Sequence, residues 1–374
     1  MSVKSRPNFL MFATWRLLAA LLVMLYHFCQ YGPPAYAKFA VDLELLTPLL
    51  DMFFMVSGFL ISVHYADRMK SIADYKIFLI RRLARLYPLH ILTLSFFCMV
   101  WLAVSAGVVS SRMTETYSLV ELINELLLIN AWGVSDVLTF NFVSWSLSAE
   151  WFCYLLFPAI LFVWRKWGVF ALIALLVIYT QIMDVLSDAG VTPFSTWMHA
   201  NTWGAYRVFA DFLIGAIVAD LASRRLLKIR SHALAWGVFA AAVGYMLTNP
   251  SWEYGPILAI SFAIYIAAQV EFNAPSTSPF YKPFMPFAAA SFGIYLWHPV
   301  LASIVIGVAW NRILKPMEIG SFYMAIIAAM ILTVLVAVLS ARFFEAPVRK
   351  TILSFVEKRE IKKKKRKAAP VPAE

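Results

Sequence analysis

Long apolar stretches alternate with short polar connections along almost the whole chain. A helix needs about 20 apolar residues to cross a bilayer. Windows that approach or exceed this length fall roughly at residues 10–30, 44–65, 87–108, 145–164, 168–186, 206–222, 233–249, 255–270, 287–310 and 321–343. The stretch 119–133 could instead form an interfacial helix or a re-entrant segment. This pattern predicts an all-α fold, a polytopic membrane helical bundle of about ten transmembrane helices.

Basic residues separate the connections into two sets and thereby predict the orientation of the bundle. With the N-terminus inside, the inner set contains Lys4, Arg6, Arg68, Lys70, Lys76, Arg81, Arg82, Arg85, Arg165, Lys166, Arg224, Arg225, Lys228, Arg230, Lys282 and the C-terminal tail. The outer set contains only Lys38, Arg112, Arg312 and Lys315. We therefore expect both termini to be cytoplasmic.

Composition agrees with a membrane protein and excludes several other classes. Of 374 residues, 62% are hydrophobic and 14% charged, whereas soluble domains are nearer a quarter charged. Much of the net charge of +11 lies in the tail, so it does not indicate a nucleic-acid partner. The three cysteines have no metal-site or disulfide spacing, and we expect no metal. We expect a transmembrane domain at 1–350 and a disordered basic cytoplasmic tail at 351–374, near anionic membrane lipids.

The first apolar stretch could alternatively be a cleavable signal peptide ending at Ala35-Tyr36-Ala37. Arg16 interrupts its apolar core, however, and Pro33 and Pro34 directly precede the candidate cleavage site. We therefore prefer a retained first transmembrane helix.

Arg16 and His27 are unexpected in this first apolar stretch, because charged and strongly polar groups are costly at membrane depth. Their separation of 11 residues places both on nearly the same helix face. His27 could act as a general base on a hydroxyl, or could simply bond a neighbouring helix. Arg16 needs an anion or carbonyl groups nearby, and a helix-packing salt bridge is its alternative interpretation.

A second polar signal is the basic run before the third window. Arg82 and Arg85 are three residues apart and would share a helix face, next to Arg81 and Tyr87. Arginine forks suit phosphate groups, so we assign these four residues to a cofactor site on the cytosolic side. Positive-inside topology with lipid headgroup contact is the alternative.

A third signal is the segment around Trp145, Ser146 and Glu150. Ser146 and Glu150 share a helix face, and Glu150 would lie on the same membrane side as His27. Its carboxylate could orient the imidazole, or could simply favour a helix N-terminus. We assign Glu150 to catalysis, and Trp145 and Ser146 to substrate binding.

Further candidates lie in the second and ninth windows. Asp51 precedes the small pair Ser57-Gly58, which we expect to serve helix packing, so Asp51 is the catalytic candidate. His298 lies in the string Tyr-Leu-Trp-His-Pro and is assigned to substrate binding, although it could be structural. Further charges at a membrane edge are Arg207, Asp211 and Glu345, of which Arg207 and Asp211 are four residues apart and could neutralise one another.

Together these strings resemble membrane acyltransferase family three, the O-acyltransferases of bacterial surface glycans. The resemblance covers nearly the whole chain. It rests, in order, on Arg16-x10-His27, DMFFMVSGFLI, RRLARLYP, SWSLSAEWFCYLLFP, FGIYLWHP and FFEAPVRK.

The resemblance implies acyl transfer from cytosolic acyl-CoA, with acetyl-CoA as the expected donor, to a hydroxyl of an extracytoplasmic glycan or lipid-linked saccharide. It implies that His27 is catalytic, that Arg16 helps to place the donor, and that Arg82 and Arg85 meet the CoA phosphates. We expect a multi-pass protein of a bacterial inner membrane. A general-base mechanism and an acyl-histidine relay both remain open.

Two alternatives remain at this point. A transporter or flippase for a glycan or lipid-linked intermediate would also have ten to twelve spans with buried charges. A lipid-acylating enzyme is closer to the preferred interpretation. The sequence leaves the acceptor sugar, the acyl chain and the oligomeric state open.

Overall fold

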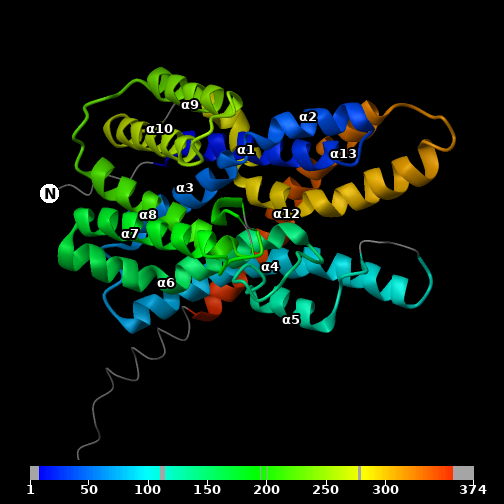
Figure 1. Ribbon diagram of the computed structural model, residues 1–374, viewed down its shortest axis with the longest axis horizontal. Helices are drawn as coiled ribbons and strands as arrows, with labels where there is room; N and C mark the ends of the chain where they lie inside the picture. The colour runs from blue at the N-terminus through cyan, green and yellow to red at the C-terminus, as the bar shows by residue number, and fades with distance from the viewer. Residues whose placement is uncertain (1–7, 110–113, 194, 200, 277–278, 357–374) are drawn as a thin grey trace, which may run out of the picture.

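The chain forms a bundle of long helices, seen in a computed structural model that describes residues 8–109, 114–193, 195–199, 201–276 and 279–356. These residues form helices, turns and loops, and no strand occurs among them. All ten apolar windows correspond to helices, in agreement with the predicted all-α fold (Figure 1). Their bounds are α1 (Leu10–Cys29), α3 (Pro48–Tyr65), α4 (Ile72–Ser105), α6 (Trp145–Trp167), α7 (Val169–Asp188), α8 (Gly204–Ser223), α9 (His232–Leu247), α10 (Tyr254–Asn273), α12 (Ser291–Leu301) and α13 (Phe322–Ser340).

Shorter elements join or extend these helices. The α-helical ones are α2 (Pro34–Glu44), α5 (Leu119–Leu127) and α11 (Met285–Ala289), and π-helical turns at Ala302–Leu314 and Ala341–Glu345 continue α12 and α13. Single 3₁₀ turns lie at Phe142–Ser144, Trp197–His199 and Pro279–Phe284. The stretch expected to be interfacial or re-entrant contains α5, which at 9 residues is too short to span a bilayer.

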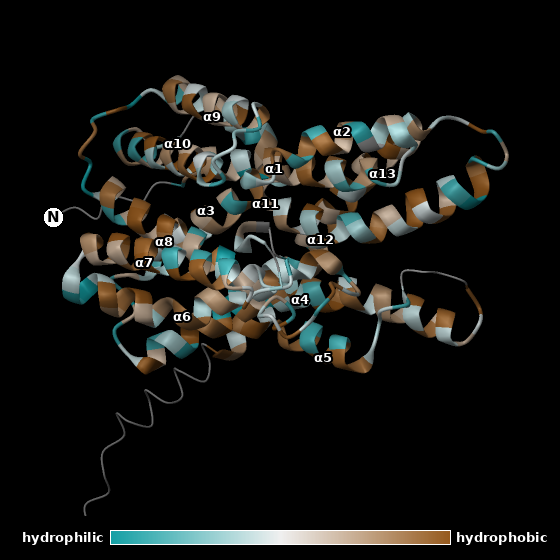
Figure 2. Ribbon diagram, viewed as in Figure 1, coloured by the Kyte–Doolittle hydropathy of each residue, from teal (hydrophilic) through white to brown (hydrophobic). Residues whose placement is uncertain are grey.

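Eight helices in the described part of the chain are long and apolar enough to cross a membrane. They are α1, α3, α4, α6, α7, α10 and the two continuous segments Ser291–Leu314 and Phe322–Val356. Large apolar side chains remain exposed on α7 and α13, and Figure 2 shows apolar colour along both helices. These faces are suited to contact with lipid, and the protein is a multi-pass membrane protein.

The two remaining windows differ in physical character. Helix α8 contains the charged residues Arg207, Asp211 and Asp220, yet most of its residues are buried because it packs against α3, α6, α7 and α10. Helix α9 has 16 residues and packs against α10. The expected count of ten spans and the positions of the termini therefore stay predictions.

Helix α4 begins well before the window that predicted it. Ser71 caps its N-terminus, because the Asp74 amide donates to the Ser71 hydroxyl at 3.2 Å and the Ser71 amide donates to the Asp74 carboxylate at 2.9 Å. The basic run from Lys76 to Arg85 is consequently helical and leads directly into the apolar part of the helix.

The basic tail expected from residue 351 begins inside a helix. Residues 351–356 continue the segment Phe322–Val356, and the rest of the tail lies outside the described residues.

Helices α3 and α8 form a backbone-to-backbone contact in the middle of the bundle. A Cβ atom at Gly58 would lie 2.3 Å from the carbonyl oxygen of Phe212. A Cβ at Gly215 would lie 2.0 Å from the carbonyl oxygen of Met55. Only glycine allows this close approach, which agrees with the predicted packing role of Gly58.

Candidate active site

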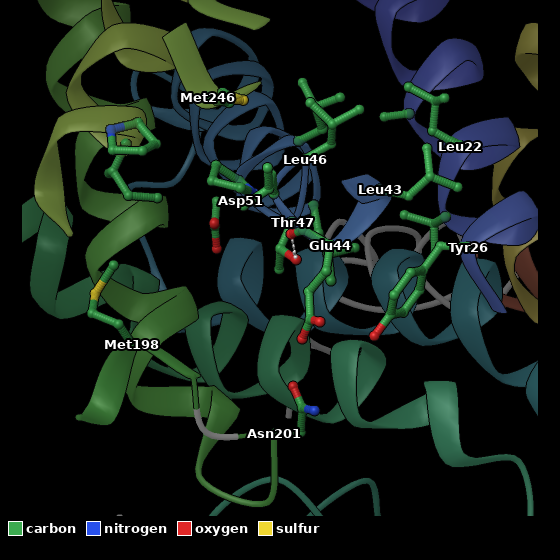
Figure 3. Close-up of a pocket in the computed structure, with 18 of the residues that line it drawn as sticks. Leu22, Tyr26, Leu43, Glu44, Leu46, Thr47, Asp51, Met198, Asn201 and Met246 are labelled. Atoms are coloured by element: carbon green, nitrogen blue, oxygen red, sulfur yellow. Dashed lines mark hydrogen bonds between the residues drawn. The ribbon is translucent and has the colours of Figure 1, made fainter. Parts of the chain in front are cut away.

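A cavity of about 620 Å³ opens at the end of the bundle where α1 ends, which we call the His27 end. It is lined by α1 together with the beginnings of α3, α6, α8 and α10 and by the connections between them (Figure 3). The α1 residues that line it are Ala19, Leu22, Val23, Tyr26 and His27. These residues lie on one face of α1. The cavity therefore extends along this face from His27 to Ala19, which is within one helical turn of Arg16.

His27 lies in the last turn of α1, half-buried in the wall of this cavity. Its ring meets the Phe142 ring edge-on, with 5.0 Å between centroids. On another side it stacks on the imidazole of His298, with 5.1 Å between centroids and 18° between planes. The turn before α6 and helix α12, which are distant in sequence, thus fix the position of the imidazole beside the cavity.

His298 is completely buried on α12, and neither of its ring nitrogens has a hydrogen-bond partner among the described residues. A buried imidazole without partners is costly. Its contacts with His27 and Tyr295, the latter at 5.8 Å between centroids, place it directly behind the cavity wall. The structure therefore brings His298 to His27, although the cavity itself is lined by Tyr295.

Trp145 and Ser146 begin α6 at the same end of the bundle. Trp145 is buried, lines the cavity and packs on Gly204 of α8, where a Cβ would lie 2.5 Å from the indole. The Ser146 hydroxyl donates to the Val143 carbonyl at 2.9 Å and is therefore already satisfied. Of these two residues, only Trp145 faces the cavity.

Asp51 lies in the cavity wall, but its carboxylate is not free. Arg207 donates to it through two bonds, Nε to Oδ1 at 2.7 Å and Nη2 to Oδ2 at 2.6 Å. Both residues are buried. This pairing corrects the expectation that Arg207 and Asp211, one turn apart, neutralise one another. Both acids lie close to Arg207, but the bidentate geometry belongs to Asp51.

Arg16 and Glu150 belong to a second polar cluster, deeper in the bundle. The Arg16 guanidinium lies over the Phe53 ring, 5.3 Å from its centroid, and interacts electrostatically with Arg85, Glu150 and Tyr154. The Glu150 carboxylate accepts a hydrogen bond from Ser57. The expected contact between Glu150 and His27 is therefore not seen, because this carboxylate faces Ser57 and the arginines.

The predicted phosphate-binding arginines join the same cluster. Arg82 donates from Nη2 to the Tyr65 hydroxyl at 3.1 Å, and its guanidinium lies 5.9 Å from the Tyr154 ring centroid. Arg81 is exposed on the next position of α4. Tyr87 points elsewhere, since its hydroxyl donates to the Leu126 carbonyl of α5 at 2.8 Å.

A second cavity, of about 430 Å³, opens at the opposite end of the bundle. Its walls come from the C-terminal ends of α3, α6, α8 and α10, among them Ser62, Trp164, Arg165 and Phe272. These two cavities therefore open at opposite ends of the bundle. No group of three or more potential metal ligands occurs among the described residues.

Three important residues were not assigned to the site from the sequence. Phe142 lies in the short turn before α6, Arg207 was expected to pair locally, and Tyr295 appeared only as part of a motif. Intramembrane charge could have singled out Arg207. No sequence signal distinguishes Phe142 from the other 29 phenylalanines of the chain.

Comparison with known proteins identifies the family. The family described as "Acyltransferase domain" matches residues 13–342. The chain is also 24% identical to nodulation protein 10 of Rhizobium leguminosarum bv. viciae, over 92% of this chain and 94% of that protein. No solved structure matches. The match covers most of the chain, including His27 and the three arginines Arg16, Arg82 and Arg85, which we call the arginine cluster. The chain therefore belongs to membrane acyltransferase family three and is a membrane O-acyltransferase.

Proposed function

We propose that this enzyme transfers an acyl group, normally acetyl, from cytosolic acyl-CoA to a hydroxyl of an extracytoplasmic saccharide. The observation that carries the proposal is the course of the larger cavity, which follows one face of α1 from His27 almost to Arg16. Charge supports the orientation, because basic residues gather at the opposite end from His27. In this orientation the His27 end faces outward, across a bacterial inner membrane.

The arginine cluster supports a donor site on the cytosolic side. Arg82 and Arg85 are well placed for phosphates of CoA, and Arg16 lies between them and the His27 cavity. The Nε atoms of Arg16 and Arg82 have no hydrogen-bond partner among the described residues. An anionic ligand would supply the missing acceptors.

His27 supplies the chemistry in this proposal. As a general base it removes the proton of the acceptor hydroxyl, and the oxygen then attacks the thioester carbonyl. The C–S bond breaks, and the proton passes from the imidazolium to the departing thiolate, giving an ester and free CoA. In the alternative relay, the imidazole is acylated first and the acceptor hydroxyl then displaces it.

The test is replacement of His27 by glutamine, with His64→Gln as the matched control. His64 lies at the far end of α3 and lines neither cavity. We expect transfer from radiolabelled acetyl-CoA in proteoliposomes to fall about 10²- to 10⁴-fold in His27→Gln. The melting temperature of this variant and the activity of His64→Gln should be close to wild type. A His27→Gln protein with wild-type activity would refute the assignment.

Rapid-quench mass spectrometry of the wild-type enzyme would separate the two mechanisms. A peptide containing His27 and an added acetyl group before acceptor is supplied indicates the relay. Its absence during active turnover favours the general base.

A further inference from the structure

The larger cavity has an unbalanced charge. Its lining contains three carboxylates, from Glu44, Asp51 and Glu253, and a single arginine, Arg207. Arg207 is committed to Asp51 through two hydrogen bonds, so this buried pair is neutral overall. The remaining charge of the lining is therefore that of two carboxylates.

Glu44 and Glu253 lie at the mouth of the cavity, on different elements. Glu44 ends α2, and Figure 3 shows its side chain in the same opening as Tyr26 and Asn201. Glu253 lies just before α10, where its carboxylate accepts a hydrogen bond from Thr196 at 2.9 Å. Neither forms an ion pair with a described residue. An entering ligand therefore meets two uncompensated negative charges.

The surrounding surface has the same sign. In the described residues, the connections at the His27 end contain three basic residues, Lys38, Arg312 and Lys315, and Arg112 lies outside the described residues. In or next to these connections, beyond the cavity lining, lie Asp42, Glu115, Glu121, Asp136, Asp188 and Glu318. A cleft whose walls and surroundings carry one sign of charge lowers the local concentration of ligands with the same sign of charge, whereas neutral ligands are not repelled.

Apart from the Asp51–Arg207 pair, the other polar groups that line the cavity are uncharged. Asn201 and Asn249 offer amide donors and acceptors, and Tyr26, Trp145 and Tyr295 offer aromatic faces and hydroxyls. Groups of this kind suit a ligand rich in hydroxyls. They provide no cation to pair with a carboxylate or phosphate on the acceptor.

We infer that the acceptor is a saccharide without negative charge, and that Glu44 and Glu253 discriminate against uronate-, sialate- or phosphate-bearing glycans. This inference rests on the proposed function and names its substrate class. The discrimination acts through repulsion of the wrong acceptor rather than through an added attraction to the right one.

Matched acceptors that differ only in charge test the inference. Wild-type enzyme in proteoliposomes is given acetyl-CoA with methyl glucoside or methyl glucuronoside, and with neutral or uronate-containing oligosaccharides. Acetyl ester and released CoA are both measured. We expect kcat/KM to favour the neutral member of each pair by about tenfold or more, and increasingly so at low salt.

Charge-reversal variants show whether the cavity mouth is responsible. Glu44→Lys should reduce the preference for neutral acceptors about tenfold, with Glu44→Gln intermediate. Asp42→Lys is the control, because Asp42 is exposed on the same helix but does not line the cavity. It should leave most of the preference intact.

Equal or better use of the anionic acceptors by wild type would overturn the inference, as would equal effects of the Glu44 and Asp42 reversals. CoA release without ester on any saccharide would overturn the saccharide class while leaving an active acyl-CoA-dependent enzyme. The absence of CoA release altogether would instead refute the proposed function, and this inference with it.

Discussion

Two ionic clusters of this bundle, one buried and one half-buried, differ in how their charges are balanced. In the Asp51–Arg207 pair, one carboxylate meets one guanidinium, and both carboxylate oxygens accept bonds of 2.6–2.7 Å. In the other cluster, three arginines (Arg16, Arg82 and Arg85) face the carboxylates of Glu150 and Glu345.

The difference indicates what each cluster is for. Asp51 and Arg207 neutralise each other's charge and form part of the wall of the larger cavity. A cluster with surplus positive charge, in which the Nε atoms of Arg16 and Arg82 have no hydrogen-bond partner among the described residues, is suited to receiving an anion. The same residue types thus serve structure in the buried pair and, as we propose, ligand binding in the half-buried arginine cluster.

Breaking the Asp51–Arg207 pair should have the largest effect on stability. Asp51→Asn removes the bidentate partner of the buried Arg207 and leaves it with the less well-placed Asp211, which we expect to cost about 3–5 kcal/mol of unfolding free energy. Thermal unfolding in detergent measures the loss. The double variant Asp51→Leu with Arg207→Met should recover most of it, because the unpaired charge is removed. A fully stable but inactive Asp51→Asn protein would instead support the catalytic role expected from sequence.

Removing arginines from the arginine cluster should affect the binding of acetyl-CoA more than the stability of the protein. In Arg82→Ala/Arg85→Ala, loss of charged hydrogen bonds worth about 1.5–3 kcal/mol should raise the KM for acetyl-CoA by tenfold or more. The melting temperature should change little, because mutual repulsion is relieved. Lys76→Ala removes an exposed charge from the same helix as a control. An unchanged KM in the double variant would indicate that these arginines set the membrane orientation and do not bind the donor.

Glu125 provides a third kind of buried carboxylate, one with neutral partners. It lies on α5, where the Asn130 side-chain amide donates to it at 3.1 Å and the Ser144 hydroxyl also donates. Burial raises the pKa of Glu125 to about 8, because hydrogen bonds from Ser144 and Asn130 only partly offset the loss of water, and nearby Glu121 opposes ionisation further. Ser144 directly precedes α6, so this contact also fixes the start of that helix.

The raised pKa of Glu125 predicts a stability that depends on pH. Both states are protonated below about pH 4.5. As pH rises towards 8 the unfolded state ionises while the folded state retains its proton, so stability falls and then levels off. Each unit of difference in pKa corresponds to about 1.4 kcal/mol. Melting temperatures between pH 5 and 8.5 should decline more steeply for wild type than for Glu125→Gln; parallel curves would contradict the assignment.

Hydrophobic periodicity was sufficient to predict ten helices, but not the short helix α2, which lies between the first two windows. All ten windows became helices, because an apolar run of this length has few other ways to satisfy its backbone in a bilayer. The beginning of α4 was misplaced since its first turns are basic, and only the Ser71–Asp74 cap indicates that they are helical.

Partners between helices were much harder to predict. Local spacing suggested Arg207 with Asp211, but the bidentate partner is Asp51, which is 156 residues away. Glu150 was placed correctly on its helix, yet the face it presents to Ser57 depends on how α3 and α6 pack. The shared face of Arg16 and His27 follows from helical geometry alone, whereas the ring of His298 against His27 required the tertiary fold.

The glycine contact between α3 and α8 limits how the enzyme can move during turnover. Backbones in direct contact at Gly58 and Gly215 cannot slide or separate without losing that packing, and the Asp51–Arg207 pair joins the same two helices. This half of the cavity wall is therefore a fixed frame. We expect any opening that admits an acceptor or releases an ester to come from the opposite wall, where α1 and α2 meet the cavity.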